Sequence, residues 1–322
     1  CQPWAAMVIE APSGTAHTIW ERSDRVIWAA ALSPSSAEAA LLTSAADHPI
    51  DWAVEFVDTV SPKTNVVEIG NWVANGEGYP DAVAGGTGGI AWLPDERSVV
   101  LALPTGGLFQ IFPDGSQISV AKASVAKRPS ALAISPDGTT IAFVDQPSAA
   151  DGTGIFAGSM KAKPIDPIVV LPADRSGNRY GCGVAWVGTT SRVVTIVDRD
   201  ELGPTQGDLF FLDTQTRMPE LVWTSPVGRD VASVEAFEIS PDAVVTAFVT
   251  NSAWRIRDKP SSVWVAQIDG PAIERFDLPV ELSLPRIAFI TEGLVVSGII
   301  PGDRDGIGLA TAYLLAPNGK LT

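Results

Sequence analysis

The feature that most constrains the fold is a short unit that recurs six times along the chain. Its clearest copy is ISPDGTTIAFVDQ, Ile134 to Gln146, in which a Pro-Asp-Gly turn separates two apolar runs. The other stretches with the same strand, tight turn and strand are AALSPSSAEAALLTS, IAWLPDERSVVLALP, VAWVGTTSRVVTIVD, FEISPDAVVTAFVTN and IAFITEGLVVSGII. Self-similarity at such a period is typical of an architecture built from equal packed units.

The spacing of the turns identifies the kind of unit. The turn positions Pro34, Pro94, Pro136, Gly188, Pro241 and Thr291 are separated by 60, 42, 52, 53 and 50 residues, close to the length of a four-stranded propeller blade. Runs such as DLFFLD and ELVWTS follow the hairpins and predict third and fourth strands. SSAEAALLTSAAD has the composition of a helix, but its place in the repeat predicts a strand.

The chain is therefore expected to be all-β, a six-bladed β-propeller of four-stranded antiparallel blades in one domain, 1–322. The expected blades are approximately 26–73, 89–125, 130–172, 183–225, 234–279 and 285–322. The last blade supplies only three apolar runs, so the N-terminal segment 1–25 is expected to close the ring. Either Met7–Glu10 or His17–Glu21 could provide the closing strand.

The repeats resemble those of the TolB-like and WD-repeat-like propeller family. Apolar-Ser-Pro-Asp-Gly followed by an Ile-Ala-Phe strand matches the first half of the TolB pattern, and VDRDELGPTQGDLFFLD and GDRDGIGLATAYLLAPNGKLT match its second half. The match is degenerate in units one, four and six. The resemblance implies a periplasmic protein-interaction module, although propellers host many functions.

The charge of the chain excludes one class of partner. The sequence contains 22 Lys and Arg against 37 Asp and Glu, a formal net charge of −15, so a polyanion is repelled at long range. We expect no nucleic-acid partner. No uninterrupted apolar stretch is long enough for a transmembrane helix.

The first residue carries the main prediction about location. Cys1 and Cys182 are the two cysteines, too few for a disulfide framework and too scattered for a zinc site. The sequence resembles a mature bacterial lipoprotein, in which lipid on an N-terminal cysteine holds the protein on a membrane. This predicts lipid attachment at Cys1 and a place on the periplasmic or extracytoplasmic face of a bacterial membrane. The alternative is an arbitrary sequence boundary.

Motifs for chemistry are scarce. His17 and His48 are the two histidines, so a His-based metal centre or a Ser-His-Asp relay lacks material. There is no Gly-x-Ser-x-Gly elbow, which excludes a complete prolyl oligopeptidase. The Asp303/Asp305 loop spaces carboxylates as calcium loops do, without the full ligand series, so Ca²⁺ there is a weak alternative to a family-typical turn. We expect no other cofactor, no metal and no catalytic residue.

Two features indicate packing and contact. Trp28, Trp92 and Trp186 lie in first strands of their units, where Trp predicts packing between blades, with a ligand platform as the alternative. The loop from Val73 to Gly89 makes the first spacing the longest, and its Tyr79, Pro80 and Asp81 are the expected partner-contact residues.

The sequence thus predicts a protein that is not an enzyme: a membrane-anchored scaffold, an accessory subunit of a larger membrane or envelope complex that acts through protein contacts. The alternative is a propeller hydrolase on a carbohydrate, lactone or peptide, with carboxylates at the channel mouth. A cluster of carboxyl groups with shifted pKa values would favour the enzyme.

Overall fold

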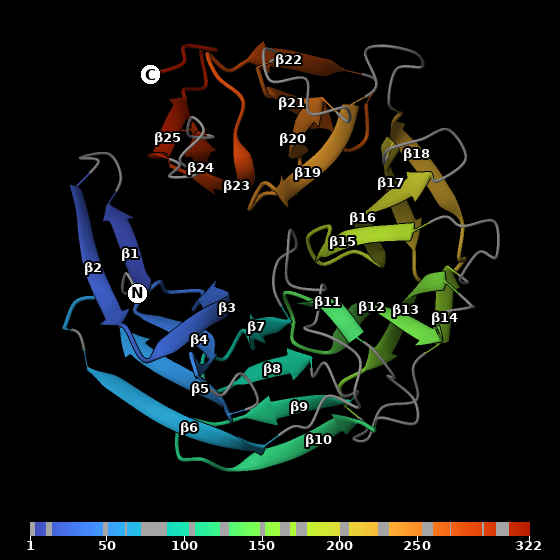
Figure 1. Ribbon diagram of the computed structural model, residues 1–322. Coiled ribbons are helices and arrows are strands. Elements are labelled where there is room, and N and C mark those ends of the chain that lie inside the picture. Colours follow the sequence, from blue (N-terminus) through green and yellow to red (C-terminus); the bar gives the residue numbers. More distant parts are fainter. Residues whose placement is uncertain are drawn as a thin grey trace. The chain divides into compact units, whose positions relative to one another are not determined.

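The computed structural model describes residues 4–10, 15–47, 51–61, 63–71, 89–102, 107–122, 129–148, 152–161, 168–171, 179–199, 206–224, 232–252, 260–270, 272–291, 293–300 and 309–322. Within these ranges the regular elements are strands, β1 to β25 (Figure 1). No helix in the same ranges is long and apolar enough to span a membrane.

The chain divides into two compact units, Cys1–Val169 and Val170–Thr322, which are described separately. The first unit holds three four-stranded sheets, with the boundary inside the last strand. They consist of β3 (Arg25–Leu32), β4 (Glu38–Ala45), β5 (Asp51–Asp58) and β6 (Thr64–Asn71); β7 (Ile90–Trp92), β8 (Val99–Ala102), β9 (Leu108–Ile111) and β10 (Gln117–Ala121); and β11 (Pro129–Ile134), β12 (Thr140–Ser148), β13 (Gly152–Ser159) and β14 (Ile168–Leu171).

The second unit holds two four-stranded sheets and one three-stranded sheet. They consist of β15 (Arg179–Trp186), β16 (Arg192–Arg199), β17 (Gln206–Asp213) and β18 (Pro219–Trp223); β19 (Ala232–Ile239), β20 (Val245–Ser252), β21 (Ser262–Gln267) and β22 (Ile273–Asp277); and β23 (Ser283–Ile290), β24 (Gly293–Ile300) and β25 (Leu309–Leu315). In every sheet the strands are ordered as in the sequence. These six sheets are the blades of a six-bladed β-propeller, which confirms the predicted fold class.

The repeated turns explain why the pattern is recognisable yet degenerate. In the clearest copy the Gly138 amide donates to the Ser135 carbonyl at 2.8 Å, and Gly138 has φ of 69°. This left-handed conformation suits glycine. The residue closes the tight turn that joins the two strands of the hairpin. The same place is held by Ser36, Glu96 and Ala243, with φ of 61°, 57° and 55°. The backbone is therefore kept where the Asp-Gly signature is lost.

The first strand of each sheet is its inner strand. Within the first unit β7 contacts both β3 and β11, and within the second unit β19 contacts both β15 and β23. Neighbouring sheets also enclose the apolar clusters. One cluster joins Phe56 to Trp92, whose rings meet edge to face at 5.6 Å, and another joins Val249 to Ile287. The core thus lies between successive blades.

Trp92 fulfils the predicted packing role, because its indole N–H also donates to the Ala31 carbonyl of the preceding sheet at 2.9 Å. Trp28 packs against the cluster that spans the first two sheets, and within it the Trp28 and Trp52 ring centroids are 5.5 Å apart. Its indole N–H donates to Ser44 Oγ of its own sheet at 2.8 Å.

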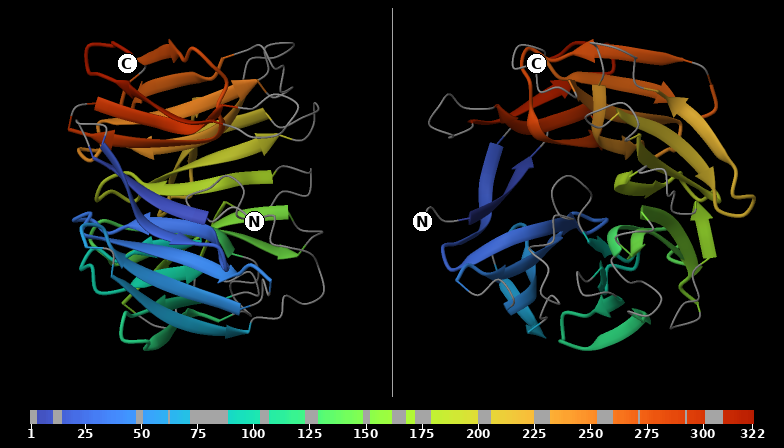
Figure 2. Two further views of the ribbon diagram at one scale, coloured as in Figure 1. Left: turned by 60° about the vertical axis from the view of Figure 1, so that its left-hand side comes forward. Right: turned by 45° about the vertical axis from the view of Figure 1, so that its right-hand side comes forward.

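The predicted closure by an N-terminal strand does not match the strand pairing. β1 (Trp4–Glu10) and β2 (Thr15–Arg22) pair with each other and contact the sheet β3–β6 (Figure 2), because Ile19 and Trp20 are buried against Leu41 and Val57. The fourth place of the last sheet is begun instead by the residues after β25. Leu314 and Thr322 exchange two backbone hydrogen bonds of 2.9 Å, and Leu321 forms a bridge with Leu315.

Candidate functional site

The residues predicted from sequence to make contacts lie outside the described residues. This holds for Cys1, for the loop residues Tyr79, Pro80 and Asp81, and for the Asp303/Asp305 loop. His48 is also outside them, whereas His17 lies on β2 with its Nε2 atom 2.9 Å from the Thr59 carbonyl oxygen. Within the described ranges, no group of three His, Cys, Asp or Glu is placed to hold a metal ion.

Asp137 caps the turn of the clearest repeat. Its Oδ1 atom accepts hydrogen bonds from Ser135 Oγ at 2.6 Å and from the Thr139 amide at 3.0 Å. These bonds to Ser135 and Thr139 lower the pKa of Asp137 to about 2. Such an exposed, fully ionised carboxylate holds its turn and is a poor proton donor.

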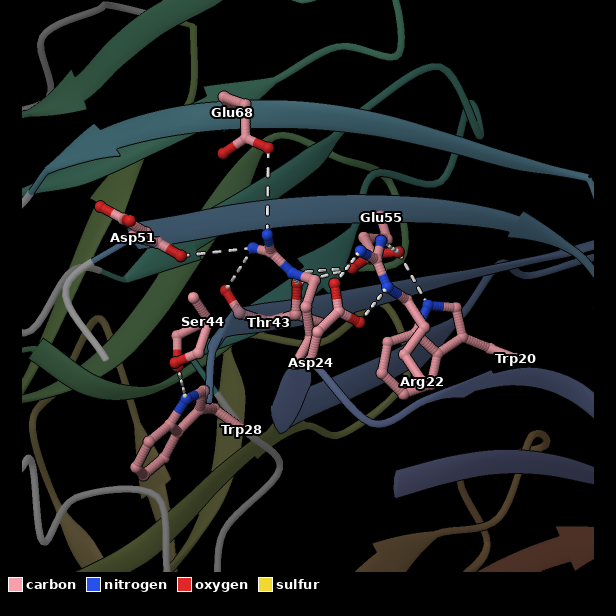
Figure 3. A network of polar contacts seen from close by, with 11 residues as sticks. Trp20, Arg22, Asp24, Trp28, Thr43, Ser44, Asp51, Glu55 and Glu68 are labelled. Atoms are coloured by element: carbon pink, nitrogen blue, oxygen red, sulfur yellow. Dashed lines mark hydrogen bonds and ion pairs between the residues drawn. The ribbon is translucent and has the colours of Figure 1, made fainter. Parts of the chain in front are cut away.

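A buried polar network joins the N-terminal hairpin to the first sheet (Figure 3). At its centre is Glu55 on β5, whose side chain is 0% exposed. Its Oε2 atom accepts the indole N–H of Trp20 at 2.7 Å, and its Oε1 atom accepts Thr43 Oγ1 at 2.8 Å. Arg25 Nε lies 3.1 Å from Oε1, and Arg22 lies 3.8 Å from Oε2.

This network is structural. A buried carboxylate requires charge and hydrogen-bond partners, and Glu55 has both. The Arg25 guanidinium is also held by Thr43 and by the Asp51 carbonyl, at 3.3 Å from the latter. With both oxygens occupied and no exposed surface, Glu55 cannot reach a substrate. It ties β2 to the sheet β3–β6.

Glu238, at the end of inner strand β19, has the opposite environment. Its neighbour Ala236 packs in the apolar cluster shared with β23–β25, and side chains two apart on a strand point to the same face. The described bond to its carboxylate is a long one, 3.3 Å, from the Ile239 amide. Desolvation raises the pKa of Glu238 to about 7, while the residue stays partly exposed.

The repeat shows that Glu238 is an exception. It stands three residues before its turn position, Pro241, and the same place in the other units holds alanine: Ala31, Ala91, Ala133, Ala185 and Ala288. Strand pairing supports the alignment, since Glu238 pairs with Ala247 as Ala133 pairs with Ala142. These alanines are partly or fully exposed, so the place is accessible in every blade. The scaffold uses a methyl group where the fifth blade has an acid.

A second exception lies on the neighbouring inner strand. Five residues before the turn, the units carry Ala29, Gly89, Ala131, Gly183 and Ala236, and then Arg286. The reason for small residues is visible at Gly183, where an added Cβ would lie 2.4 Å from Phe237 Cε1 of the next sheet. Arg286 on β23 is exposed. Its guanidinium donates one described hydrogen bond, to the backbone carbonyl of the preceding residue, Pro285, at 3.1 Å.

The Arg286 guanidinium is solvent-accessible yet surrounded by protein. Desolvation lowers its pKa, although an arginine of this kind remains charged at neutral pH. No ion pair between Arg286 and a carboxylate occurs among the described residues. The inner strands β19 and β23 therefore present one protonatable acid and one cation without a described counter-charge.

Turn signatures and tryptophans drew the sequence interpretation away from these two residues. Glu238 lies in FEISPD and Arg286 in PRIAFI, both inside the recognised repeats. Comparing the third and fifth positions before each turn would have found them. The chemistry is an accessible carboxyl that is protonated near neutral pH, a property suited to proton donation.

Comparison with known proteins places the fold. No family model matches the chain, and no curated protein sequence matches it. Among solved structures, an oligogalacturonate lyase from Vibrio parahaemolyticus is 11% identical with a TM-score of 0.65, covering 100% of this chain and 84% of that one. A xyloglucanase from Xanthomonas campestris is 14% identical with a TM-score of 0.62, over 88% of this chain and 46% of that one.

A third similar structure is the β-propeller domain of the Trilobed protease from Pyrococcus furiosus, which has an open velcro topology. It is 9% identical with a TM-score of 0.59, covering 93% of this chain and 84% of that one. At these identities the likeness shows the fold alone. The TolB-like and WD-repeat-like assignment receives support only at the level of the propeller.

The prediction that the chain is not an enzyme is wrong. It depended on the absence of a recognised motif and on likeness to interaction modules, but the structures that share the fold are a lyase, a glycanase and the propeller domain of a protease.

Proposed function

We propose that this chain is a propeller enzyme that hydrolyses a carbohydrate, with Glu238 as the proton donor. The observation that carries the proposal is the Glu238 carboxyl: it is partly exposed on an inner strand, has a pKa of about 7, and replaces an alanine of the repeat. A carboxyl group that keeps its proton near neutral pH can protonate a departing oxygen.

In the proposed step the Glu238 proton moves to the glycosidic oxygen as the bond between that oxygen and the sugar carbon breaks. Water supplies hydroxide to the carbon, and its remaining proton restores the Glu238 carboxyl. Glycosidases generally use a second carboxylate to activate the water or to attack the sugar. The described residues assign only the proton donor.

Among the substrate classes open to a propeller enzyme, we propose a carbohydrate. Two of the similar structures, the lyase and the xyloglucanase, bear names of enzymes that act on glycans. The absence of a Gly-x-Ser-x-Gly elbow from the sequence also argues against a serine-dependent route to peptide cleavage.

The test is turnover of a panel of oligosaccharides, measured from product masses, by the wild type, Glu238→Gln and Glu238→Asp. Hydrolysis gives products that together contain one added water. We expect Glu238→Gln to lose about 100-fold or more in kcat, the usual contribution of a general acid. Glu274→Gln is the matched control, because Glu274 is exposed on β22 at the outer edge of the same sheet.

Two results would oppose the proposal. Full activity of Glu238→Gln would remove the acid from the mechanism. Products with an unsaturated sugar end and no added water would assign elimination in place of hydrolysis. The pH profile of kcat/KM gives a further check, since the rate should fall above about pH 7 as Glu238 loses its proton.

We also propose, from the sequence alone, that the protein contacts a membrane-protein complex on the periplasmic or extracytoplasmic face of a bacterial membrane through the loop with Tyr79, Pro80 and Asp81. Identification of the proteins that co-purify from native membranes tests this partner.

A further inference from the structure

We infer that the Phe289 ring covers the Glu238 carboxyl and keeps water from one side of it. Phe289 is then a positioning residue, because it acts through the acid and does not itself touch the substrate. The inference rests on the proposed function and adds to it the residue of the next blade that prepares the acid.

The first step is the face of the fifth sheet from which the Glu238 side chain projects. Glu238 pairs directly with Ala247 on β20, and the side chains of directly opposed residues lie on the same face. Ala247 is 0% exposed and belongs to the apolar cluster that the fifth sheet shares with β23–β25. The Glu238 carboxyl therefore faces the sixth sheet, whose inner strand β23 contacts β19 directly (Figure 1).

The second step is the register between neighbouring inner strands, counted back from the turn position of each unit. Trp92, two residues before its turn, donates to the carbonyl of Ala31, three residues before the preceding turn. An added Cβ at Gly183, five residues before its turn, would lie 2.4 Å from Phe237, four residues before the next turn. In both contacts a residue meets the one that stands one place closer to the turn in the following blade.

In the fifth and sixth blades this register brings Glu238, three residues before its turn, against Phe289, two residues before the next turn. The pair two places further back, Ala236 and Ile287, follows the same register, since both residues belong to the shared cluster. Phe289 is a partly buried member of that cluster. Its ring is therefore the side chain of the sixth blade that lies over the Glu238 carboxyl.

The third step is the chemistry of an aromatic ring beside a carboxyl group. A phenylalanine ring has no hydrogen-bond donor and its face carries partial negative charge, so it favours a neutral carboxyl over a carboxylate. In two other blades the same place holds a tryptophan, Trp92 or Trp186, whose indole has an N–H donor. The blade beside the acid carries an aromatic side chain without a donor, in agreement with the desolvation that raises the pKa of Glu238 to about 7.

The other charged groups leave this role to burial. The described titratable groups around the interface are Glu235 on β19 itself, Asp242 in its turn, Glu274 on β22, Tyr313 on β25 and Lys320 after β25. Glu274 and Lys320 lie three strands out from the inner strands, which is roughly 14 Å. Arg286 lies on the opposite face of β23, because its neighbour Ile287 packs toward the fifth sheet.

The experiment follows the Glu238 carboxyl by NMR of protein labelled with ¹³C in its glutamate carboxyl groups, with Glu238→Gln to assign the signal. We expect the wild type to titrate with a midpoint at about pH 7. Phe289→Ala admits water and should lower the midpoint by about one pH unit or more. Phe289→Leu introduces the residue that Leu32 provides in the first blade, and it should stay close to the wild type because it also excludes water.

Two further variants complete the test. Phe289→Gln puts an amide donor beside the carboxylate without leaving an empty space, so it should lower the midpoint even if Phe289→Ala does not fold. Ile134→Ala is the matched control, because Ile134 stands at the same place in the third blade and is partly buried between other sheets. It should leave the Glu238 midpoint unchanged.

The inference is overturned if Phe289→Ala and Phe289→Gln keep the midpoint of the wild type, if Ile134→Ala lowers it as much, or if the wild type titrates at the ordinary value of 4.5. Glycan turnover separates this result from the proposed function. A midpoint that depends on Phe289, with no glycan cleaved, would support the positioning role and refute the hydrolase. Cleavage that depends on Glu238, with a high-pH limit of kcat/KM that Phe289→Ala does not move, would do the reverse.

Discussion

The raised pKa of Glu238 makes the stability of the protein depend on pH in a defined direction. The group ionises at an ordinary value of 4.5 in the unfolded chain and at about 7 in the folded one. The folded state therefore holds the proton more tightly. Stability is greatest below pH 4.5, falls as the pH rises, and reaches a constant lower level above about pH 7.

The size of this loss follows from the same two pKa values. A tenfold change in proton affinity is worth about 1.4 kcal/mol, so the rise from 4.5 to about 7 corresponds to roughly 3 kcal/mol. Partial exposure of the side chain reduces the figure to roughly 2–3 kcal/mol. Most of the loss falls between pH 5.5 and pH 8, because the unfolded chain is already ionised there.

The perturbation is Glu238→Ala, the residue that five blades carry at this place, with Glu238→Gln as the variant closest in shape. We expect either variant to be more stable than the wild type by about 1.5 kcal/mol at pH 8, relative to the difference at pH 5.5. Urea denaturation followed by fluorescence of the ten tryptophans gives the free energy of unfolding at each pH.

The comparison of two pH values removes the effect of altered packing, which is the same at both. A difference between variant and wild type that does not change with pH would refute the reasoning. The wild type and the variants would then change in stability by the same amount between pH 5.5 and pH 8. That result would mean that Glu238 is solvated or has an ion partner.

Three further changes test other parts of the fold, each by chemical denaturation at neutral pH. Glu55→Gln should cost about 3 kcal/mol or more, because it removes the buried carboxylate that pairs with Arg25 at 3.1 Å; a loss below about 1 kcal/mol would contradict a structural role for the network. Ser36→Gly should stabilise by up to about 1 kcal/mol, since φ of 61° is unfavourable for serine; destabilisation would argue against that turn geometry. Gly183→Ala should destabilise by about 1–3 kcal/mol, because its Cβ would meet Phe237, and a neutral effect would mean that the sheets can separate there.

Much of the fold follows from the sequence because local and tertiary preferences agree. Pro-Asp-Gly turns, β-branched runs and regular spacing all favour hairpins, and even EAALLTSA, a segment with helical composition, forms strand β4. Its buried side chains pack on both faces, which a propeller blade allows and an isolated sheet does not.

The role of the N-terminal segment could not be predicted by counting strands. The hydrogen bond from Trp20 to Glu55 attaches the N-terminal hairpin to the first sheet, and these two residues are 35 positions apart in the sequence. Nothing in either local sequence indicates such a pair. The candidate site was obscured for another reason: Glu238 and Arg286 lie inside strands whose turn residues fit the repeat, and attention to turns favours the loops.

The alanines that precede five of the six turns give the chain an internal reference. The blades pack in the same way, so the residue that five of them share at a position is the one that packing requires. A different residue in the sixth blade is therefore not required by packing. At Glu238 the scaffold accepts an acid that it does not need and that weakens it above neutral pH. Pseudo-symmetry therefore separates, within one molecule, the residues that make a propeller from those that give one blade a task of its own.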